Sequence, residues 1–309
     1  KNGEKPFVKN YNKIARQAGM TLIELTVVLL VLIGLAGLMI PYVSGFVAKT
    51  HDSTGTNNLA NLNGTIQRFH TQFNSMPDDL HSLVTTGTTA IYPAMMNPNM
   101  LTATTYTSDG TAGMVGTEVP LVSLVTAGMS SVYEMKDGTT NGSKTFDAGN
   151  ASVAIPNGMM AAAGTVDVAV LNAGDRFSVE NHLAKAFGRQ VSDFDSACYD
   201  YVVMGVGQES QLTGNAIQEA PVHFAQNGDM GPENNYNRFV AVFQVDKAMA
   251  LVASSAASID AATGTLPTSG CAAGTEQAKF VGTAMVMMPN HIIGLAEELD
   301  AAYTHMSAN

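Results

Sequence analysis

The strongest constraint on this chain is a long apolar segment near its start, residues 20–42, which reads MTLIELTVVLLVLIGLAGLMIPY and holds one charged residue, Glu24. At about 1.5 Å per residue, these 23 residues would form a helix of roughly 34 Å, enough to cross a hydrocarbon core of ~30 Å. Apolar and polar residues do not alternate along it, so a strand is not favoured. The segment therefore predicts a transmembrane helix.

Charge around this segment is unevenly distributed. Residues 1–19 carry a net charge of +4, whereas the rest of the chain has 10 basic and 25 acidic residues, a net charge of −15. Because basic flanks tend to stay in the cytoplasm, we expect the start of the chain inside and its bulk outside. The acidic bulk also argues against nucleic acid as a primary partner.

Three other interpretations of the apolar segment remain open. A cleaved secretory signal would have a shorter apolar region, about 7–15 residues, and a small-residue cleavage site after it, whereas Ser44 and Gly45 follow a longer run here. An ordinary single-span anchor fits the length but does not explain an acidic residue near its start. A buried core helix would usually be shorter.

Glu24 is the unusual residue of the segment. An ionisable group near the centre of a membrane helix costs about 2.5–3.5 kcal/mol, and such a group suggests a functional partner. In an isolated helix, Glu24 could instead lie at the level of the lipid headgroups. The residues that precede it favour the functional interpretation.

Residues 19–25 read GMTLIEL, follow a basic stretch and precede the long apolar run. This arrangement resembles the class III signal of type IV pilins and pseudopilins, and the resemblance covers roughly residues 14–80. It implies that a membrane prepilin peptidase cuts after Gly19 and methylates the new N-terminus at Met20, so that residues 1–19 are a cleaved leader. Methionine stands in place of the more usual phenylalanine, as in some type IVb pilins.

The resemblance also implies roles for Glu24 and Pro41. In an apolar bundle, the α-amine freed at Met20 and the Glu24 carboxylate of a neighbouring subunit can neutralise each other, which offsets the desolvation cost of an unmatched carboxylate and favours one axial register. Pro41 stands where many family members have a helix-interrupting proline that lets filaments stretch. A simple kink, common in membrane helices, is the alternative.

The pattern after Pro41 becomes amphipathic, with one apolar stripe made of Leu59, Leu62, Ile66, Phe69 and Phe73. Pro77 disfavours helical geometry at Met76, so the helix should end near Asn74. We therefore expect a spine helix over residues 20–74, whose first part, 20–42, lies in the membrane or filament core. Its stripe would dock a globular head formed by residues 75–309.

For this head we expect an α+β fold, in which the long helix packs on an antiparallel sheet with inserted loops and helices. Strands are predicted at residues 166–171, 199–206, 222–225, 238–245 and 280–287. Helices are predicted at residues 179–187, 248–258 and 292–305. Residues 97–117 and 261–275 are of low complexity and predict surface loops. Residues 73–83 resemble the turn and short helix that follow the spine in pseudopilins.

Cys198 and Cys271 are the only cysteines, and their spacing is not that of a metal site. If this part of the chain lies outside the cytoplasm, we expect a disulfide between them that contributes on the order of 4 kcal/mol. Two free buried thiols are the alternative.

We find little sign of catalysis or metal binding. The seven histidines form no HExxH motif or close ligand cluster, and His182 beside Glu180 predicts a surface pair on a helix. No GxSxG or P-loop occurs, and Gly205 and Gly207 lack the third glycine of a nucleotide loop. No cofactor is predicted. Calcium is a lesser possibility in two polar segments, with an ordinary loop as the alternative: Asn227, Asp229, Glu233 and Asn234, or Asp193, Asp195 and Asp200.

The sequence therefore predicts a non-enzymatic structural subunit, a pilin, of a type IV pilus or related filament. It would lie in the inner membrane before assembly and then self-assemble into a helical polymer, with the prepilin peptidase and an inner-membrane assembly platform as partners. Alternatives within the family are a pseudopilin of a type II secretion system and a minor tip pilin or adhesin. A membrane-tethered hydrolase would need a clustered nucleophile, base or metal.

Overall fold

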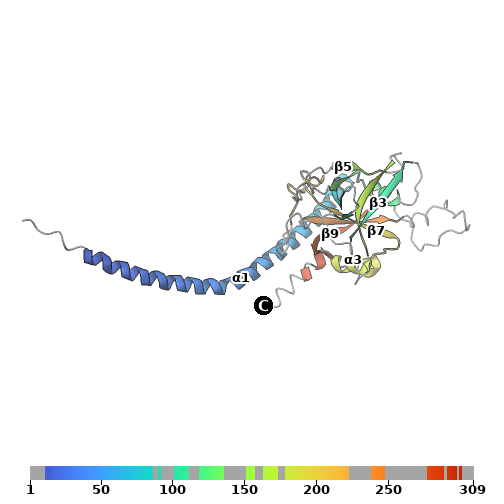
Figure 1. Cartoon of the computed structure of the whole chain (residues 1–309). Helices are drawn as coiled ribbons and strands as arrows, with labels where there is room; N and C mark the ends of the chain where they lie inside the picture. Colours follow the sequence, from blue (N-terminus) through green and yellow to red (C-terminus); the bar gives the residue numbers. More distant parts are fainter. Residues whose placement is uncertain are drawn as a thin grey trace, which may run out of the picture. The chain divides into compact units, whose positions relative to one another are not determined.

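The computed structural model of the chain describes residues 11–85, 90–91, 101–110, 118–135, 151–156, 163–172, 178–222, 238–247, 277–288, 291–297 and 299–300 (Figure 1). The chain divides into two compact units, Lys1–His51 and Asp52–Asn309, which we call the helical unit and the sheet unit. Helix α1 (Tyr11–Phe73) begins in the first unit and ends in the second. The boundary thus falls inside the predicted 20–74 helix.

The described part of the helical unit is the first part of α1. Its stretch Leu22–Ile40 has a mean hydropathy of 2.6, and none of it is buried within the chain. Because it spans 19 residues, it is long enough to cross a membrane. Among the described residues it is the one helix with the length and composition to do so.

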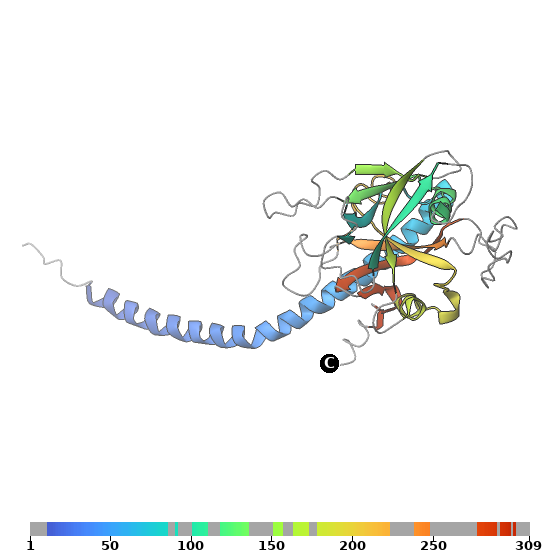
Figure 2. The same cartoon turned by 45° about the vertical axis from the view of Figure 1, so that its right-hand side comes forward.

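The sheet unit is built on a mixed sheet of ten strands, flanked by the short helices α2 (Val119–Thr126) and α3 (Val179–Phe187) (Figure 2). The strands, in chain order, are β1 (Leu80–Thr85), β2 (Ala90–Ile91), β3 (Leu101–Asp109), β4 (Ser131–Met135), β5 (Ala151–Ala154), β6 (Ala163–Leu171), β7 (Tyr199–Gly205), β8 (Phe239–Asp246), β9 (Lys279–Met288) and β10 (His291–Gly294).

Along the sheet the order is β10-β9-β8-β7-β1-β4-β5, while β6 pairs with β7, β3 with β6 and β2 with β1. All these pairs are antiparallel except β1 and β4, which run parallel. The expectation of an antiparallel sheet is therefore wrong at this pair. A parallel pair needs a crossover connection, and here residues 86–130, including α2, supply it.

One face of the sheet is covered by the second part of α1. Leu59, Leu62, Ile66 and Phe69 are at most 2% exposed and join α2 and sheet residues in one core cluster. The predicted stripe is confirmed for these four residues. Phe73 remains 48% exposed, although its ring centroid lies 4.5 Å from that of Phe69. The helix ends where predicted, since Asn74 adopts a left-handed conformation with φ 52° and its N–H donates to the His70 carbonyl.

The other face of the sheet is covered by α3. Val240 and Val242 of β8 belong to a second core cluster with α3, whereas Phe239, Ala241 and Phe243 face the cluster that contains α1. Because both faces of β8 are buried, the strand lacks the polar alternation of a surface strand.

Four predicted strands and one helix are confirmed within three residues of their ends. These are β6, β7, β8, β9 and α3, the last with the predicted bounds. Val222 forms an isolated antiparallel bridge with Arg238, at the first residues of the strands predicted at 222–225 and 238–245. Residues 223–225, 248–258 and 261–275 lie outside the described residues.

Three predictions are wrong. Residues 101–109, expected in a loop, form β3 and pair with β6 along their whole length, because threonine is β-branched and suits a pleated surface. Residues 80–85, expected near a short helix, form β1. Residues 292–294, expected at the start of a helix over 292–305, belong to β10, which pairs with β9, whereas residues 295–297 and 299–300 are helical as predicted. The sequence prediction also missed β2, β4, β5 and α2.

The buried stripe of α1 predicts a clear stability effect. Ile66 is fully buried, so Ile66→Ala should lower the free energy of unfolding by about 2–5 kcal/mol. Gln67→Ala, at the exposed next residue, should change it by less than about 0.5 kcal/mol. Urea unfolding of the full chain in detergent micelles, followed by near-UV circular dichroism, measures both. Equal effects would contradict the packing described here.

Candidate functional site

The most unusual surface of the chain is the apolar stretch Leu22–Ile40 in the helical unit. Its large apolar side chains are about half to three-quarters exposed, for example Leu22 at 65%, Leu30 at 75% and Leu38 at 76%. A contiguous exposed apolar surface of this kind marks a site of interaction with a membrane or another protein. It is therefore the candidate functional site.

Glu24 is an exposed residue in the first turns of this stretch, and it is the sole charged residue of residues 22–40. Thr26, its nearest polar neighbour along the helix, donates its hydroxyl hydrogen to the Ile23 carbonyl at 2.9 Å. The hydroxyl of Thr26 is thus satisfied within the helix, whereas the Glu24 carboxylate is a charge on an otherwise apolar surface.

The remaining predicted site residues of the segment also lie in α1. Gly19 and Met20 have helical backbone, so the predicted cleavage bond lies within a helix, and Met20 precedes Glu24 by about one turn. The helix continues through Pro41, so the proline does not end it. A Cβ added at Gly34 or Gly37 would meet nothing within 4 Å. Packing within the chain therefore does not require glycine at either position.

Within the sheet unit, a tertiary hydrogen bond supplements the apolar packing of α1. The hydroxyl of Thr283 on β9, which is 2% exposed, donates to the Leu59 carbonyl on α1 at 2.9 Å. This bond joins residues 224 positions apart and satisfies a buried polar side chain.

Asp78, in the turn after α1, connects that turn to two distant loops. Its backbone N–H donates to Gln211 Oε1 at 3.1 Å, and its carbonyl accepts from the Gln211 N–H at 3.0 Å. Its carboxylate accepts from the Ser130 hydroxyl at 2.8 Å and the Ser131 N–H at 3.3 Å. The direction in which the chain leaves α1 is fixed by these bonds.

Close to this turn, His81 and Glu209 form a largely buried pair, with 2.7 Å between His81 Nε2 and Glu209 Oε2. The hydrogen bond from His81 lowers the pKa of Glu209, against the opposing effect of burial. A Cβ at Gly207 would lie 1.8 Å from His81 Nε2, so glycine is required there to admit the imidazole. Gly207 thus has a packing role, which no local sequence pattern indicates.

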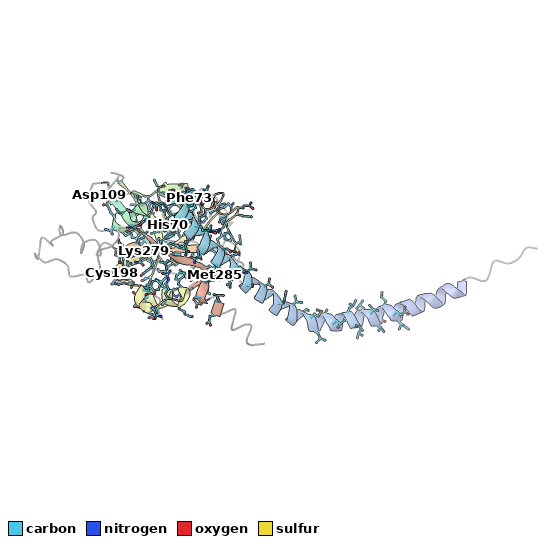
Figure 3. The ribbon with its side chains drawn as sticks, turned by 180° about the vertical axis from the view of Figure 1, so that it is seen from behind. His70, Phe73, Asp109, Cys198, Lys279 and Met285 are labelled. Atoms are coloured by element: carbon cyan, nitrogen blue, oxygen red, sulfur yellow. The ribbon has the colours of Figure 1, made fainter. Side chains whose placement is uncertain are left out.

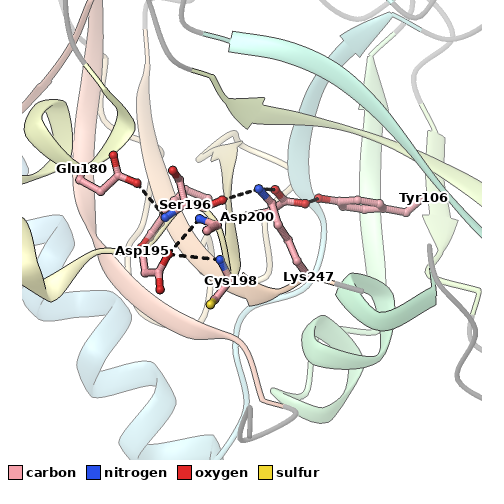
Figure 4. Close-up of polar contacts among 9 residues, drawn as sticks. Tyr106, Glu180, Asp195, Ser196, Cys198, Asp200 and Lys247 are labelled. Atoms are coloured by element: carbon pink, nitrogen blue, oxygen red, sulfur yellow. Dashed lines mark hydrogen bonds and ion pairs between the residues drawn. The ribbon is translucent and has the colours of Figure 1, made fainter. Parts of the chain in front are cut away.

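Cys198 is buried and disulfide-bonded, while Cys271, the other cysteine of the chain, lies outside the described residues. A polar network surrounds Cys198 (Figure 4). Asp195 Oδ1 accepts from the N–H groups of Ala197 and Cys198 at 2.9 and 3.3 Å. The backbone at Cys198 is therefore held by its own neighbours as well as by the disulfide.

The same network reaches Tyr106 on β3 and Lys247, the residue that follows β8. Asp200 Oδ1 lies 3.2 Å from Lys247 Nζ, and Asp200 Oδ2 accepts from the Tyr106 hydroxyl at 2.8 Å (Figure 4). Burial and the neighbouring Asp200 raise the pKa of Tyr106 well above its usual value, so the phenol stays protonated and remains a donor.

The predicted calcium ligands do not converge in the described part of the chain. Asp195 and Asp200 have the protein partners given above, and Asp193 Oδ2 accepts from the Gln190 N–H at 3.1 Å. No group of three His, Cys, Asp or Glu residues among the described residues could hold a metal ion. The other candidate set, Asn227, Asp229, Glu233 and Asn234, lies outside the described residues.

The prediction of a surface pair at Glu180 and His182 is wrong for His182, which is 2% exposed. Helix α3 turns this residue toward the second core cluster, together with Leu183 and Ala184. The sequence did not predict the burial of His182, because a polar side chain is usually assigned to the exposed face of a helix.

No protein-family model, curated protein or solved structure matches the chain. The resemblance to pilins therefore depends on residues 19–25 and the apolar run that follows them.

Glu180 predicts a pH effect on stability. Burial raises its pKa, but hydrogen bonds from Ser196, Ser178 and its own backbone outweigh this and lower the pKa from 4.5 to about 2. The Ser196 N–H contributes one of these bonds at 2.8 Å. A lowered pKa stabilises the folded state fully above pH 4.5, and this stabilisation is lost as the pH falls toward about 2.

Glu180→Gln should therefore lower the denaturation midpoint at pH 7, and the difference from the unsubstituted chain should shrink as the pH falls from 4.5 toward 2. Glu219→Gln is the matched control, because Glu219 is exposed and has no partner among the described residues. Urea midpoints at pH 7, 4 and 3 measure the effect. A difference that stays constant with pH would contradict the assignment.

Proposed function

We propose that the protein is a structural subunit of a type IV pilus or related filament, which assembles through the exposed apolar part of α1. One observation carries the proposal: Leu22–Ile40 is apolar and wholly unburied, while residues further along the same helix lie in the core of a folded sheet unit. A folded domain that carries such a helix needs another apolar environment for it.

Two environments would satisfy this need in turn. The stretch is long enough to cross a membrane, which would hold the subunit before assembly. In the filament, the same surface would be buried against equivalent helices of other copies. The sheet unit would then remain outside the bundle as the head of the subunit, and Leu59, Leu62, Ile66 and Phe69 would attach it to the spine.

Glu24 favours a role in filament assembly over that of a simple membrane anchor. A membrane anchor gains nothing from a carboxylate in its first turns, and the cost of burying that carboxylate is offset only by a partner. The α-amine of Met20, freed by cleavage after Gly19, is the partner that the family resemblance implies. Because one copy's amine would meet another copy's carboxylate, the pair would select one axial register.

Processing tests the first step of the proposal. Mature protein purified from cells should begin at Met20 with a methylated amine, because the prepilin peptidase would remove everything before it. Gly19→Leu should block cleavage and leave the leader attached. Intact-mass and N-terminal peptide analysis measure both. A native protein that keeps residues 1–19, or that begins well after Tyr42, would rule the proposal out.

Glu24→Leu tests the assembly step. It should leave cleavage and membrane insertion unchanged but reduce filament yield by about tenfold or more, since a register preference of about 1.4 kcal/mol already corresponds to tenfold. Thr26→Leu is the matched control, because it adds the same side chain without removing a charge. Sheared filaments are counted by electron microscopy and identified by peptide mass. Normal yield with Glu24→Leu would contradict the role of the carboxylate.

The same electron micrographs distinguish a major pilin from the alternative functions. Long surface filaments made mainly of this chain indicate a major pilin, and a short periplasmic filament indicates a secretion pseudopilin. A few copies at a filament tip indicate a minor pilin or adhesin. Membrane-bound monomer with no filament under any condition would indicate an anchored domain instead.

A further inference from the structure

A groove lies between α1 and the start of β9 in the sheet unit, with a volume of about 460 Å³. Its floor is apolar and buried, made by Ile66, Met76 and Ala278. Its rim is polar and includes Thr71, His70 and Lys279. Figure 3 labels the last two. We call this the α1/β9 groove. An apolar floor with a polar rim is the usual composition of a recognition site.

The charge of the α1/β9 groove differs from that of the chain. None of its described lining residues is Asp or Glu, whereas acidic residues outnumber basic ones 26 to 15 in the sequence. Lys279 on its rim is exposed and has no carboxylate partner among the described residues. The other lysines with described side chains are paired, Lys185 with Glu297 at 2.7 Å and Lys247 with Asp200 at 3.2 Å.

Acidic copies of one chain repel each other when they pack closely, so a filament of them needs local contacts of opposite sign. The α1/β9 groove offers an ammonium group, Lys279, with no carboxylate partner in the described part of the chain, beside an apolar floor. A segment that places a carboxylate next to an apolar side chain would satisfy both features, and the acidic chain itself is rich in carboxylates. In a filament, neighbouring copies are also present at high effective concentration.

We propose that the α1/β9 groove receives a carboxylate-bearing segment of a neighbouring copy of this chain, as a contact between sheet units in the filament. This inference rests on the proposed function, because it needs copies held side by side. Lys279 supplies the charge contact, and the floor buries an apolar side chain of the incoming segment.

Charge reversal tests the role of Lys279. Lys279→Glu should reduce filament yield by about tenfold or more, whereas Lys279→Arg should assemble normally. Arg68→Glu is the matched control: Arg68 is an exposed residue of α1 outside the groove, and its reversal changes the net charge by the same amount. Equal yields for Lys279→Glu and Arg68→Glu would overturn the inference, because general repulsion alone would then explain both.

Blocking the groove gives an independent readout. Thr71→Trp should fill the α1/β9 groove and reduce yield, while Gln72→Trp, at the exposed next residue outside the groove, should not. A photo-crosslinking amino acid at position 71 in purified filaments should capture an acidic segment of a second copy, identified by peptide mass. Capture of lipid, a small molecule or a different protein would overturn the inference, as would an absence of crosslinks.

The two proposals fail differently. If the unsubstituted chain forms no filament, or if Glu24→Leu assembles normally, the proposed function is at fault. If the unsubstituted chain assembles, Glu24→Leu does not, and Lys279→Glu behaves like Arg68→Glu, the inference about the α1/β9 groove alone is wrong.

Discussion

The sheet unit depends on the burial of one stripe of α1. Leu59, Leu62, Ile66 and Phe69 pack with residues of α2 and of several strands in a single cluster, and Thr283 adds a hydrogen bond to the helix backbone. Because these side chains are nearly inaccessible, the second part of α1 is an integral part of the core. Removing it would expose the sheet residues that share this cluster.

The first part of α1 has the opposite property. Its apolar side chains have no partner within the described chain, so the free energy of burying them is available for a membrane or for other copies. One helix thus carries two apolar surfaces, and only one of them is used in folding. In the proposed filament, Glu24 would distinguish the unused surface from an ordinary anchor, since a charge there favours a partner of opposite sign over lipid.

The features that depend on local periodicity were predicted correctly from the sequence. The spacing of Leu59 to Phe69, the end of α1 and the bounds of α3 follow from patterns within a few residues. The sequence prediction failed where pairing between distant segments decides the structure. The threonine-rich residues of β3 have the composition of a loop, and pairing with β6 makes them a strand. Likewise, His81 and Glu209 stand 128 residues apart, and nothing near either residue indicates the other. Glu24 and the apolar run of the candidate site were visible in the sequence, whereas the separate α1/β9 groove was not.

The bond between Leu59 and Thr283 has a consequence for biosynthesis. A ribosome adds about 5–20 residues per second, so the 224 residues between these partners take about 10–45 s to make. Throughout that interval the stripe of α1 has been synthesised but the last strands that cover it have not. A newly made chain therefore exposes two apolar surfaces at once, and the second stays uncovered until β9 has been synthesised.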